Sequence, residues 1–275
     1  MEKSYLFVPA SKPERIAKAL QTKADAIIID LEDAVALAQK DSVRRSLTKA
    51  IPKFQHVQKK IILRINDRTT PFWKADVQFA ARYEFLGVML PKVNGPEDVK
   101  ALATYLHENQ EIIPLVETAK GIQFAYEIAT ASPATSRLAF GAIDYCLDLG
   151  ISVSPTSEEL LYPRSRVVVA SRAAGLIPPI DTVFANFVDI DGLVTDAKRA
   201  KQLGFQAKLC IHPKQLDVVN EVFLPTEVEL EWAFQVVSAF EQVEKEGSGS
   251  IQLNGKMVDY PVYKQAIQII QRSRL

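Results

Sequence analysis

Short runs of aliphatic and β-branched residues recur along most of the chain. The cores of several runs, such as Ile27-Ile28-Ile29 and Ile61-Ile62-Leu63, are continuous and do not alternate with polar residues. Continuous apolar runs are typical of strands buried on both faces, as in a parallel sheet covered by helices. The pattern therefore predicts eight strands: Ser4–Pro9, Ala26–Glu32, Lys60–Asn66, Gly87–Lys92, Glu111–Glu117, Arg137–Asp144, Thr182–Phe187 and Ala207–Pro213.

Helix-like stretches separate most of these runs. The first has Ser11 as a candidate N-cap, and a later one opens with the acidic residues Glu97 and Asp98, which suit a helix N-terminus. Alternating β and α units repeated eight times predict an α/β fold that closes into a (β/α)8 TIM barrel. An open, doubly wound sheet is the alternative, although no GxGxxG motif follows any predicted strand. The helices predicted within the barrel are Pro13–Thr22, Gln39–Ala50, Pro96–Asn109, Lys120–Thr130, Glu158–Ala174 and Thr195–Leu203.

The pattern changes in the last fifty or so residues. Asn254-Gly255 lies between two short apolar runs, and this dipeptide favours the type I′ turn of a β-hairpin. Asp259 lies near the N-cap of a final helix. We therefore expect residues 1–225 to form the barrel and residues 226–275 to form a C-terminal extension that acts as a brace or a lid. Its predicted parts are the helix Thr226–Glu244, the flexible segment Glu246–Ser250, the hairpin strands Ile251–Leu253 and Lys256–Val258, and the lid helix Pro261–Arg274.

Composition narrows the range of partners. The 275 residues include 33 Lys plus Arg and 33 Asp plus Glu, so the formal net charge is zero and no basic excess is present to neutralise nucleic acid phosphates. No apolar run approaches the roughly 20 residues needed to cross a bilayer, so no membrane partner is expected. The two cysteines are too few for a disulfide framework, and the N-terminus lacks the pattern of a secretory leader. We expect a cytoplasmic protein with two partly buried thiols.

Charged side chains follow the carboxyl ends of the predicted strands, whereas the amino ends have no comparable set. In TIM barrels the active site lies at the carboxyl ends of the strands. The asymmetry therefore predicts an active site at this rim. The residues concerned are Asp30, Glu32, Asp33, Arg64, Lys92, Glu117, Asp144 and His212.

Glu117 and Asp144 end adjacent predicted strands, which brings their carboxylates close together. Two oxygen ligands without an accompanying His or Cys suit Mg²⁺ or Mn²⁺, with the remaining positions left for water and substrate. Two alternatives stay open. The acids can be held by salt bridges to Arg or Lys, or they can act as a general acid/base pair that shares a proton.

Arg64 carries a planar, permanently charged group that suits a carboxylate or a developing enolate oxygen. A salt bridge from Arg64 to Glu32 or Asp33 is an equally good and compatible interpretation. The acids Asp30, Glu32 and Asp33 can orient Arg64 or metal-bound water from behind, or cap the helix after the second strand. Lys92 either binds substrate oxygens or forms a salt bridge at the rim.

Other reactive residues give weaker signals. His212 precedes Pro213, so a structural role is at least as consistent with its position as catalysis. Arg164 and Arg166 lie near the start of a predicted helix and can bind an anion, although exposed charge on the helix surface is the simpler interpretation. No Gly-Xaa-Ser-Xaa-Gly motif occurs, and neither cysteine has an obvious His partner, which disfavours nucleophilic hydrolysis.

Taken in order, several short blocks resemble the citrate lyase beta-subunit and malyl-CoA lyase family within the HpcH/HpaI aldolase group. Asp30-Leu31-Glu32-Asp33-Ala34-Val35 is the most distinctive of them. Ala10-Ser11 and Ala36-Leu37 depart from the Gly and Pro that the family commonly has at these points. The other matching blocks are Ser4–Pro9, Leu63–Asn66, Pro91-Lys92, Val116–Thr118, Phe140–Asp144, Arg164–Arg166, Gly204-Phe205 and Ile211–Pro213.

The resemblance implies a (β/α)8 barrel that assembles as a homotrimer or hexamer. It implies Mg²⁺ bound by Glu117 and Asp144, and Arg64 in contact with the oxygens of a 2-oxo acid and an enolate. In several CoA-dependent members a C-terminal Asp, often on a neighbouring subunit's lid, acts in proton transfer. Asp259, in Met257-Val258-Asp259, matches that residue.

The function implied by the resemblance is retro-Claisen cleavage of a 3-hydroxy acyl thioester, of the citramalyl-, malyl- or citryl type, into an acetyl-type thioester and a 2-oxo acid. The expected partners are therefore an acyl-CoA or acyl-carrier thioester and a 2-oxo acid. One alternative is a metal-dependent 2-oxo acid aldolase that uses no thioester, with His212 as its base. Another is a citrate lyase beta subunit that is active only within a carrier-protein complex.

Overall fold

A computed structural model describes residues 2–84, 86–245 and 247–273. The chain divides into two compact units, Glu2–Asn220 and Glu221–Leu275, each with its own core. The division falls within helix α10 (Leu216–Val222), whereas we predicted the domain boundary after residue 225, which stays a prediction.

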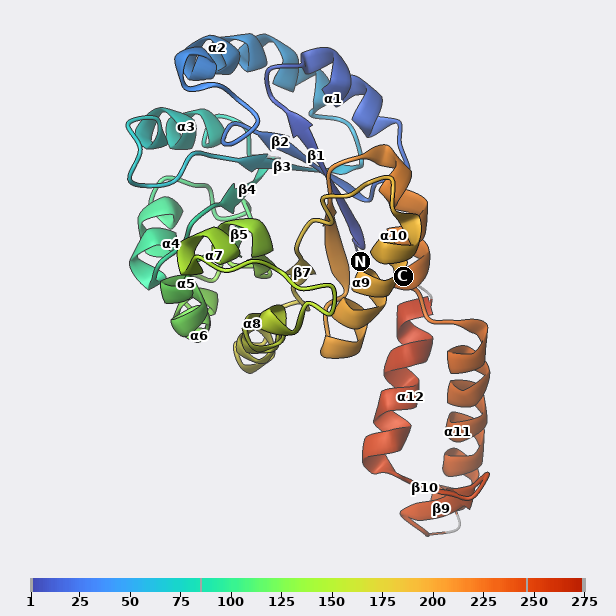
Figure 1. Ribbon diagram of the computed structural model, residues 1–275. Coiled ribbons are helices and arrows are strands. Elements are labelled where there is room, and N and C mark those ends of the chain that lie inside the picture. Colours follow the sequence, from blue (N-terminus) through green and yellow to red (C-terminus); the bar gives the residue numbers. More distant parts are fainter. Residues whose placement is uncertain (1, 85, 246, 274–275) are drawn as a thin grey trace. The chain divides into compact units, whose positions relative to one another are not determined.

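The first unit is a closed barrel of eight parallel strands in the order β1 to β8. Neighbouring strands pair in register, for example Phe7 with Ile28 and Ile28 with Ile62. The predicted (β/α)8 barrel is therefore confirmed, and the helices of this unit form a layer outside the strands (Figure 1). The strands are β1 (Ser4–Pro9), β2 (Ala26–Asp30), β3 (Lys60–Arg64), β4 (Leu86–Leu90), β5 (Ile112–Val116), β6 (Ala139–Phe140), β7 (Ile180–Asp181) and β8 (Ala207–Cys210).

The barrel interior is filled by side chains from all eight strands, including Tyr5, Ile28, Ile62 and Met89. The neighbouring residue Ile27 is also fully buried, although it is not part of this inner cluster. Side chains of one strand point alternately to its two faces, so strands buried on both faces need apolar residues at successive positions. This requirement explains the continuous apolar runs in the sequence.

In the described part of the chain, helices α1 to α10 precede α11, and the pattern missed α3, α7 and α10. Helix α1 begins after Lys12 without a side-chain cap, so the prediction of Ser11 as its N-cap is wrong. The helices are α1 (Pro13–Leu20), α2 (Lys40–Ala50), α3 (Trp73–Ala80), α4 (Pro96–Ala103), α5 (Ala119–Gln123), α6 (Ala125–Ala129), α7 (Ala142–Leu149), α8 (Leu161–Ala173), α9 (Ile190–Leu203) and α10. Short 3₁₀ turns cover Leu37–Gln39, Ile51–Phe54, Glu158–Leu160 and Pro213–Gln215.

Two predicted strands need correction. The run Arg137–Asp144 contains the two-residue strand β6, but this strand ends at Phe140 and helix α7 starts at Ala142. The run Thr182–Phe187 is not a strand, because β7 ends at the preceding residue, Asp181. In both places apolar residues continue past the end of the strand, into helix α7 after β6 and into the loop after β7, so hydrophobicity alone placed the boundary wrongly.

Four charged side chains form a buried network between strands β7 and β8 and helices α8 and α9. Lys208 Nζ donates to Asp181 at 2.6 Å and to Asp196 at 2.6 Å. Arg164 donates to Asp181 from Nε at 2.9 Å and to Asp196 from Nη2 at 2.8 Å. Arg164 is therefore buried in an ion-pair network, and its interpretation as exposed helix-surface charge is wrong.

Both cysteines are free and buried. Burial raises the pKa of the Cys210 thiol to about 12 and raises the pKa of Cys146 as well. No helix in the described ranges is both long and apolar enough to pass through a bilayer.

The second unit contains α11 (Glu227–Lys245), the antiparallel hairpin β9 (Ser250–Leu253) and β10 (Lys256–Asp259), and α12 (Tyr260–Ser273). Asn254 and Gly255 have φ values of 49° and 77°, the positive pair that a type I′ turn requires. The predicted hairpin is confirmed. Phe240, Val258 and Ala266 belong to a separate core, while Glu246 and Arg274, at the ends of predicted segments, lie outside the described residues.

Replacing Lys208 with Met is expected to destabilise the barrel. The substitution leaves Asp181 and Asp196 buried with one cation fewer, and breaking a buried ion pair costs about 3–5 kcal/mol. Chemical denaturation followed by circular dichroism measures the change. The matched control is Lys198→Met on the exposed side of α9, expected to change stability by less than about 0.5 kcal/mol. Equal stabilities for the two variants would contradict the role given to the buried network.

Candidate active site

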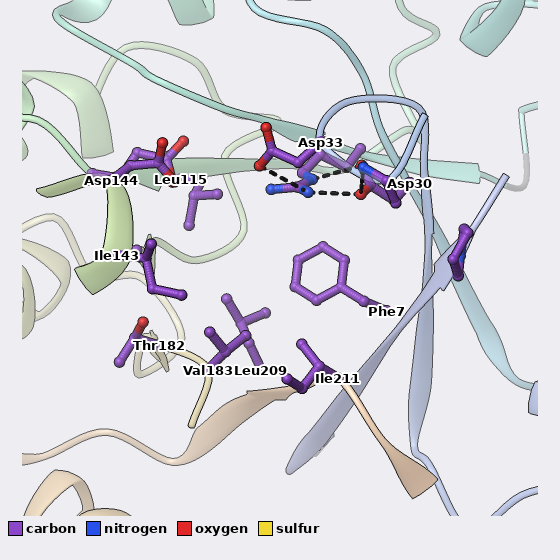
Figure 2. A pocket seen from close by; sticks show the side chains of 15 residues that line it. Phe7, Asp30, Asp33, Leu115, Ile143, Asp144, Thr182, Val183, Leu209 and Ile211 are labelled. Carbon is purple, nitrogen blue, oxygen red and sulfur yellow. Dashed lines mark hydrogen bonds and ion pairs between the residues drawn. The ribbon is translucent and has the colours of Figure 1, made fainter. Parts of the chain in front are cut away.

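A cavity of about 400 Å³ opens at the carboxyl ends of the barrel strands. Figure 2 shows Asp30, Asp33 and Asp144 along one side of it, and Val183, Leu209 and Ile211 on the opposite side. The cavity therefore has an acidic face and an apolar face. Arg64, Glu117, Gly141 and Thr182 also line it, so most of the residues predicted at the rim do meet around one space.

Glu117 directly follows β5 and is 1% exposed. Its Oε1 accepts a 2.8 Å hydrogen bond from the backbone N–H of Lys92. A Cβ atom at Gly141 would lie 2.4 Å from Oε2 of Glu117, so only glycine permits this approach of the loop after β6. Burial, followed by the charges of Asp144 and Glu32, raises the pKa of Glu117 to about 8.

Asp144 reaches the cavity from the first turn of helix α7 and not from the end of a strand, which corrects the prediction. Its position near the N-terminus of the helix favours a negative side chain. The start of α7 is fixed by a 2.9 Å hydrogen bond from the Ala142 N–H to Thr182 Oγ1. The predicted proximity to Glu117 holds, because both residues line the same cavity and Asp144 raises the pKa of Glu117.

Lys92 links the acids. It follows β4 with φ of 51°, in the left-handed region that non-glycine residues rarely adopt, so its conformation is strained. Its ammonium group pairs with Glu32 and lies 3.6 Å from Asp144 Oδ1. Burial lowers the pKa of Lys92, but the hydrogen bond and charge of Glu32 outweigh it and hold the pKa above its usual value. The salt-bridge interpretation of Lys92 is therefore realised.

The chemistry of Glu117 and Asp144 fits a divalent cation. Burial of Glu117 beside Asp144 and Glu32 is electrostatically unfavourable, as its raised pKa records, and a bound cation would remove that cost. Within the described ranges no cluster of three or more His, Cys, Asp or Glu side chains is arranged to hold a metal. A site with two protein carboxylates leaves its other positions to water and substrate oxygens, as is common for Mg²⁺.

Arg64, the last residue of β3, forms a bidentate pair with Asp30, with Nε and Nη2 donating at 2.8 and 2.7 Å. Nη1 lies 3.1 Å from Glu32 Oε2, and Nη2 lies 3.3 Å from Asp33. Burial lowers the pKa of Arg64, but these acids outweigh it and raise the pKa, so the group stays charged. The guanidinium also lies over the ring of Phe7, 4.7 Å from its centroid.

The loop that carries Glu32 and Asp33 is fastened by residues that the sequence did not indicate. Asp30 accepts hydrogen bonds from the N–H groups of Glu32 and Ala34, at 2.8 and 3.1 Å, so it caps this loop and not a helix. The buried Lys40 donates to the carbonyls of Leu31 and Glu32 at 2.7 and 2.6 Å. It also donates to Asn66 Oδ1 at 2.7 Å. Because its partners are carbonyl and amide oxygens, no charge pattern in the sequence could reveal Lys40.

Two predicted residues take other positions. The His212 ring accepts a hydrogen bond from Lys214 N–H at 3.1 Å and stacks on Phe187 with ring centroids 4.6 Å apart, so its role is structural. Asp259 belongs to the second unit and accepts a 3.3 Å hydrogen bond from Val262 N–H at the start of α12. Its position near the helix cap agrees with the prediction, and its role in proton transfer stays a prediction.

Comparison with known proteins identifies the family of this chain. The family model described as HpcH/HpaI aldolase/citrate lyase matches residues 3–213, and the chain belongs to this family. The predicted family is therefore confirmed.

Individual relatives cover nearly the whole chain. The citrate lyase subunit beta of Leuconostoc mesenteroides subsp. cremoris is 35% identical over 98% of this chain and 93% of its own length. The mitochondrial citramalyl-CoA lyase of Mus musculus is 31% identical over 98% of this chain and 85% of its own. A crystal structure of CitE from Mycobacterium tuberculosis in complex with magnesium, acetoacetate and coenzyme A superposes with a TM-score of 0.86. It is 34% identical and covers 100% of this chain and 98% of that one.

Replacing Gly141 with Ala is expected to weaken metal binding. The added methyl group would overlap Glu117 Oε2 and displace the carboxylate, which should raise the Kd for Mn²⁺ or Mg²⁺ by about tenfold or more. Isothermal titration calorimetry measures this affinity. The matched control is Gly95→Ala, where nothing lies within 4 Å of the new Cβ. Unchanged metal affinity in Gly141→Ala would argue against Glu117 as a ligand.

Proposed function

We propose that this protein is a Mg²⁺-dependent carbon–carbon lyase. Its substrate would be a 3-hydroxy acyl thioester, cleaved into an acetyl-type thioester and a 2-oxo acid. The observation that carries the proposal is the buried Glu117 beside Asp144 on a cavity rim that also presents Arg64. The predicted class, a carbon–carbon lyase, is confirmed by the citrate lyase beta and citramalyl-CoA lyase relatives. Magnesium, the predicted cofactor, is named in the complexes of CitE.

Glu117 and Asp144 would hold the metal. A Mg²⁺ ion at this place supplies Lewis acidity that lowers the pKa of a bound hydroxyl group and favours the 2-oxo acid product. The backbone N–H of Lys92 and the close packing of Gly141 fix the direction of the Glu117 carboxylate. The Lys92 ammonium group pairs with Glu32, and its charge partly offsets the burial that raises the pKa of Glu32.

Arg64 would stabilise the charge that develops on the thioester carbonyl. The breaking C–C bond leaves its electron pair on the carbon next to that carbonyl, and the negative charge is delocalised onto the carbonyl oxygen. Glu32 Oε2 has no hydrogen-bond partner among the residues that the structure describes, so its ion pair with Nη1 does not use a directed N–H. An N–H of Nη1 therefore stays available for a substrate oxygen, and Arg64 is buried, where such a donor is more effective than in bulk water.

Asp259 would transfer the proton to the carbon of the enolate, in its own subunit or in a neighbouring one. The support is its match to the family motif and its place at the end of β10, on the unit with a separate core. Assembly as a trimer or hexamer and a cytoplasmic location belong to the same proposal.

A citrate lyase beta subunit that works on a carrier protein is the second candidate, because relatives with that name match nearly the whole chain. The thioester-independent aldolase is disfavoured, since His212, its required base, caps a turn and stacks on Phe187. The decisive assay offers citramalyl-, malyl- and citryl-CoA with Mg²⁺ and measures release of the 2-oxo acid. Activity that appears only after addition of an acyl carrier protein would favour the second candidate.

Replacing Glu117 with Gln is expected to abolish the Mg²⁺-dependent activity while the barrel remains folded. Changes in residues that only support metal ligands cost about 10–100-fold, so loss of a ligand should lower kcat/KM by roughly a hundredfold or more. Thioester cleavage with and without EDTA, together with circular dichroism, tests this. Glu127→Gln, on the exposed face of α6, is the control. Normal turnover of Glu117→Gln would remove Glu117 from the metal site.

Replacing Asp259 with Asn is expected to slow exchange of solvent deuterium into the α-carbon of acetyl- or propionyl-CoA by about a hundredfold or more. Mg²⁺ affinity should stay unchanged. Asn caps a helix about as well as Asp, so a loss of exchange cannot be attributed to a weakened α12. Mass spectrometry of the recovered thioester measures the rate. Exchange at the original rate would leave Asp259 with its capping role alone.

A further inference from the structure

One face of the active-site cavity is acidic and the opposite face is apolar, and this difference limits which substrate groups each face can contact. Val183, Leu209 and Ile211 form an apolar wall opposite the carboxylates (Figure 2). This wall, defined as Val183, Leu209 and Ile211, comes from the loop after β7, from β8 and from the residue after β8. Nothing in it can hydrogen-bond through a side chain, so it suits a hydrocarbon group and not a charged one.

The cavity also has little unpaired positive charge for a second substrate carboxylate. Arg64 is the one cationic residue among the described residues that line the cavity. Its charge is already matched by the bidentate contact with Asp30 and is shared with Glu32 and Asp33. The Lys92 ammonium is likewise paired with Glu32 and lies near Asp144. Carboxylates outnumber cations here, and a divalent ion would offset only part of the excess.

A 2-oxo acid product brings one carboxylate in every case. That group and the adjacent carbonyl are the natural partners of the acidic, metal-binding face. Substrates of the proposed lyase differ in the other substituent on the hydroxyl-bearing carbon. It is a hydrogen in a malyl thioester, a methyl in a citramalyl thioester and a carboxymethyl in a citryl thioester. The second substituent would then face the apolar wall.

Building on the proposed function, we propose that the preferred substrate is a citramalyl-type thioester, whose methyl group packs on the apolar wall of Val183, Leu209 and Ile211. In the reaction the bond between C2 and C3 of the acyl chain breaks and its electron pair stays on C2. The hydroxyl proton leaves, C3 becomes the carbonyl carbon of pyruvate, and protonation of C2 gives the acetyl thioester. No oxidant or reductant is required.

The apolar wall also predicts how well the other two thioesters bind. A malyl thioester leaves the methyl-sized space unfilled, and a missing methyl in an apolar pocket lowers kcat/KM by about tenfold or more. A citryl thioester places a carboxylate against aliphatic side chains, while the two described cations of the rim, Arg64 and Lys92, are already paired with acids, so it is the least favourable of the three.

Measurement of kcat/KM for citramalyl-, malyl- and citryl-CoA with Mg²⁺ tests the proposal. The expected result is that citramalyl-CoA exceeds malyl-CoA by about tenfold and exceeds citryl-CoA by more. Preference for citryl-CoA or malyl-CoA would overturn the substrate assignment while leaving the proposed lyase function intact. If none of the three is cleaved, with or without an acyl carrier protein, the proposed function itself fails and the assignment with it.

Two variants of Ile211 test whether the second substituent of the hydroxyl-bearing carbon contacts the apolar wall. Ile211 is 41% exposed, so a longer polar side chain can be accommodated there without disrupting the barrel. Ile211→Lys adds a cation to the apolar wall, and Ile211→Gln adds a side chain of comparable reach without charge. The ratio of citryl-CoA to citramalyl-CoA kcat/KM should be at least about tenfold higher in the Lys variant than in the Gln variant. Equal ratios would show that the substituent does not lie on this wall, which overturns the proposal.

Discussion

The carboxylate of Glu117 is buried beside two other acids, and the arrangement of the rim follows from the electrostatic consequence. A group in this position resists ionisation, as its pKa of about 8 indicates. The protein nevertheless directs it firmly, through the Lys92 N–H on one side and the bare backbone of Gly141 on the other. Burying such a carboxylate lowers the stability of the fold, but it suits a divalent cation, because the attraction to a bound ion would offset the unfavourable free energy of burial.

The two cations near Glu117 are already paired with the acids of the rim. Lys92 and Arg64 divide their contacts among Asp30, Glu32, Asp33 and Asp144, so no strong positive field is left over for additional anionic groups. Lys40 in turn holds the acidic loop through the backbone carbonyls of Leu31 and Glu32. The acidic residues therefore lie on one side of the cavity, opposite Val183, Leu209 and Ile211. The acidic side of the cavity suits the carboxylate and carbonyl of the 2-oxo acid through a metal ion, and the apolar side suits a hydrocarbon group.

The sequence was sufficient for the architecture because the barrel imposes simple patterns. Doubly buried strands require continuous apolar runs such as Ile27-Ile28-Ile29, and the paired positive φ angles at Asn254 and Gly255 require the residues found there. The boundaries around β6 and β7 were not recoverable in this way. Ala142 and Ile143 continue the apolar run into helix α7, so Asp144 seemed to end a strand.

The position of Glu117 and Arg64 at the cavity was predictable, because both follow or end strands of the barrel. Elsewhere the partner decides the role, and the partner is distant in the sequence. Arg164 resembles a surface residue until Asp181 and Asp196 are brought against it. Gly141 lies in a block that resembles the family, but the sequence does not reveal its role, because the need for a missing side chain depends on where Glu117 lies in space.

The condition of the two cysteines has a consequence for an enzyme that handles activated acyl groups. A thiolate near such a compound can take the acyl group from its sulfur carrier by transthioesterification, which would leave the protein acylated. Cys210 and Cys146 are both buried, and burial keeps both in the protonated, poorly nucleophilic form. The chain thus offers no competing sulfur nucleophile, and the acyl group stays with the carrier that delivered it.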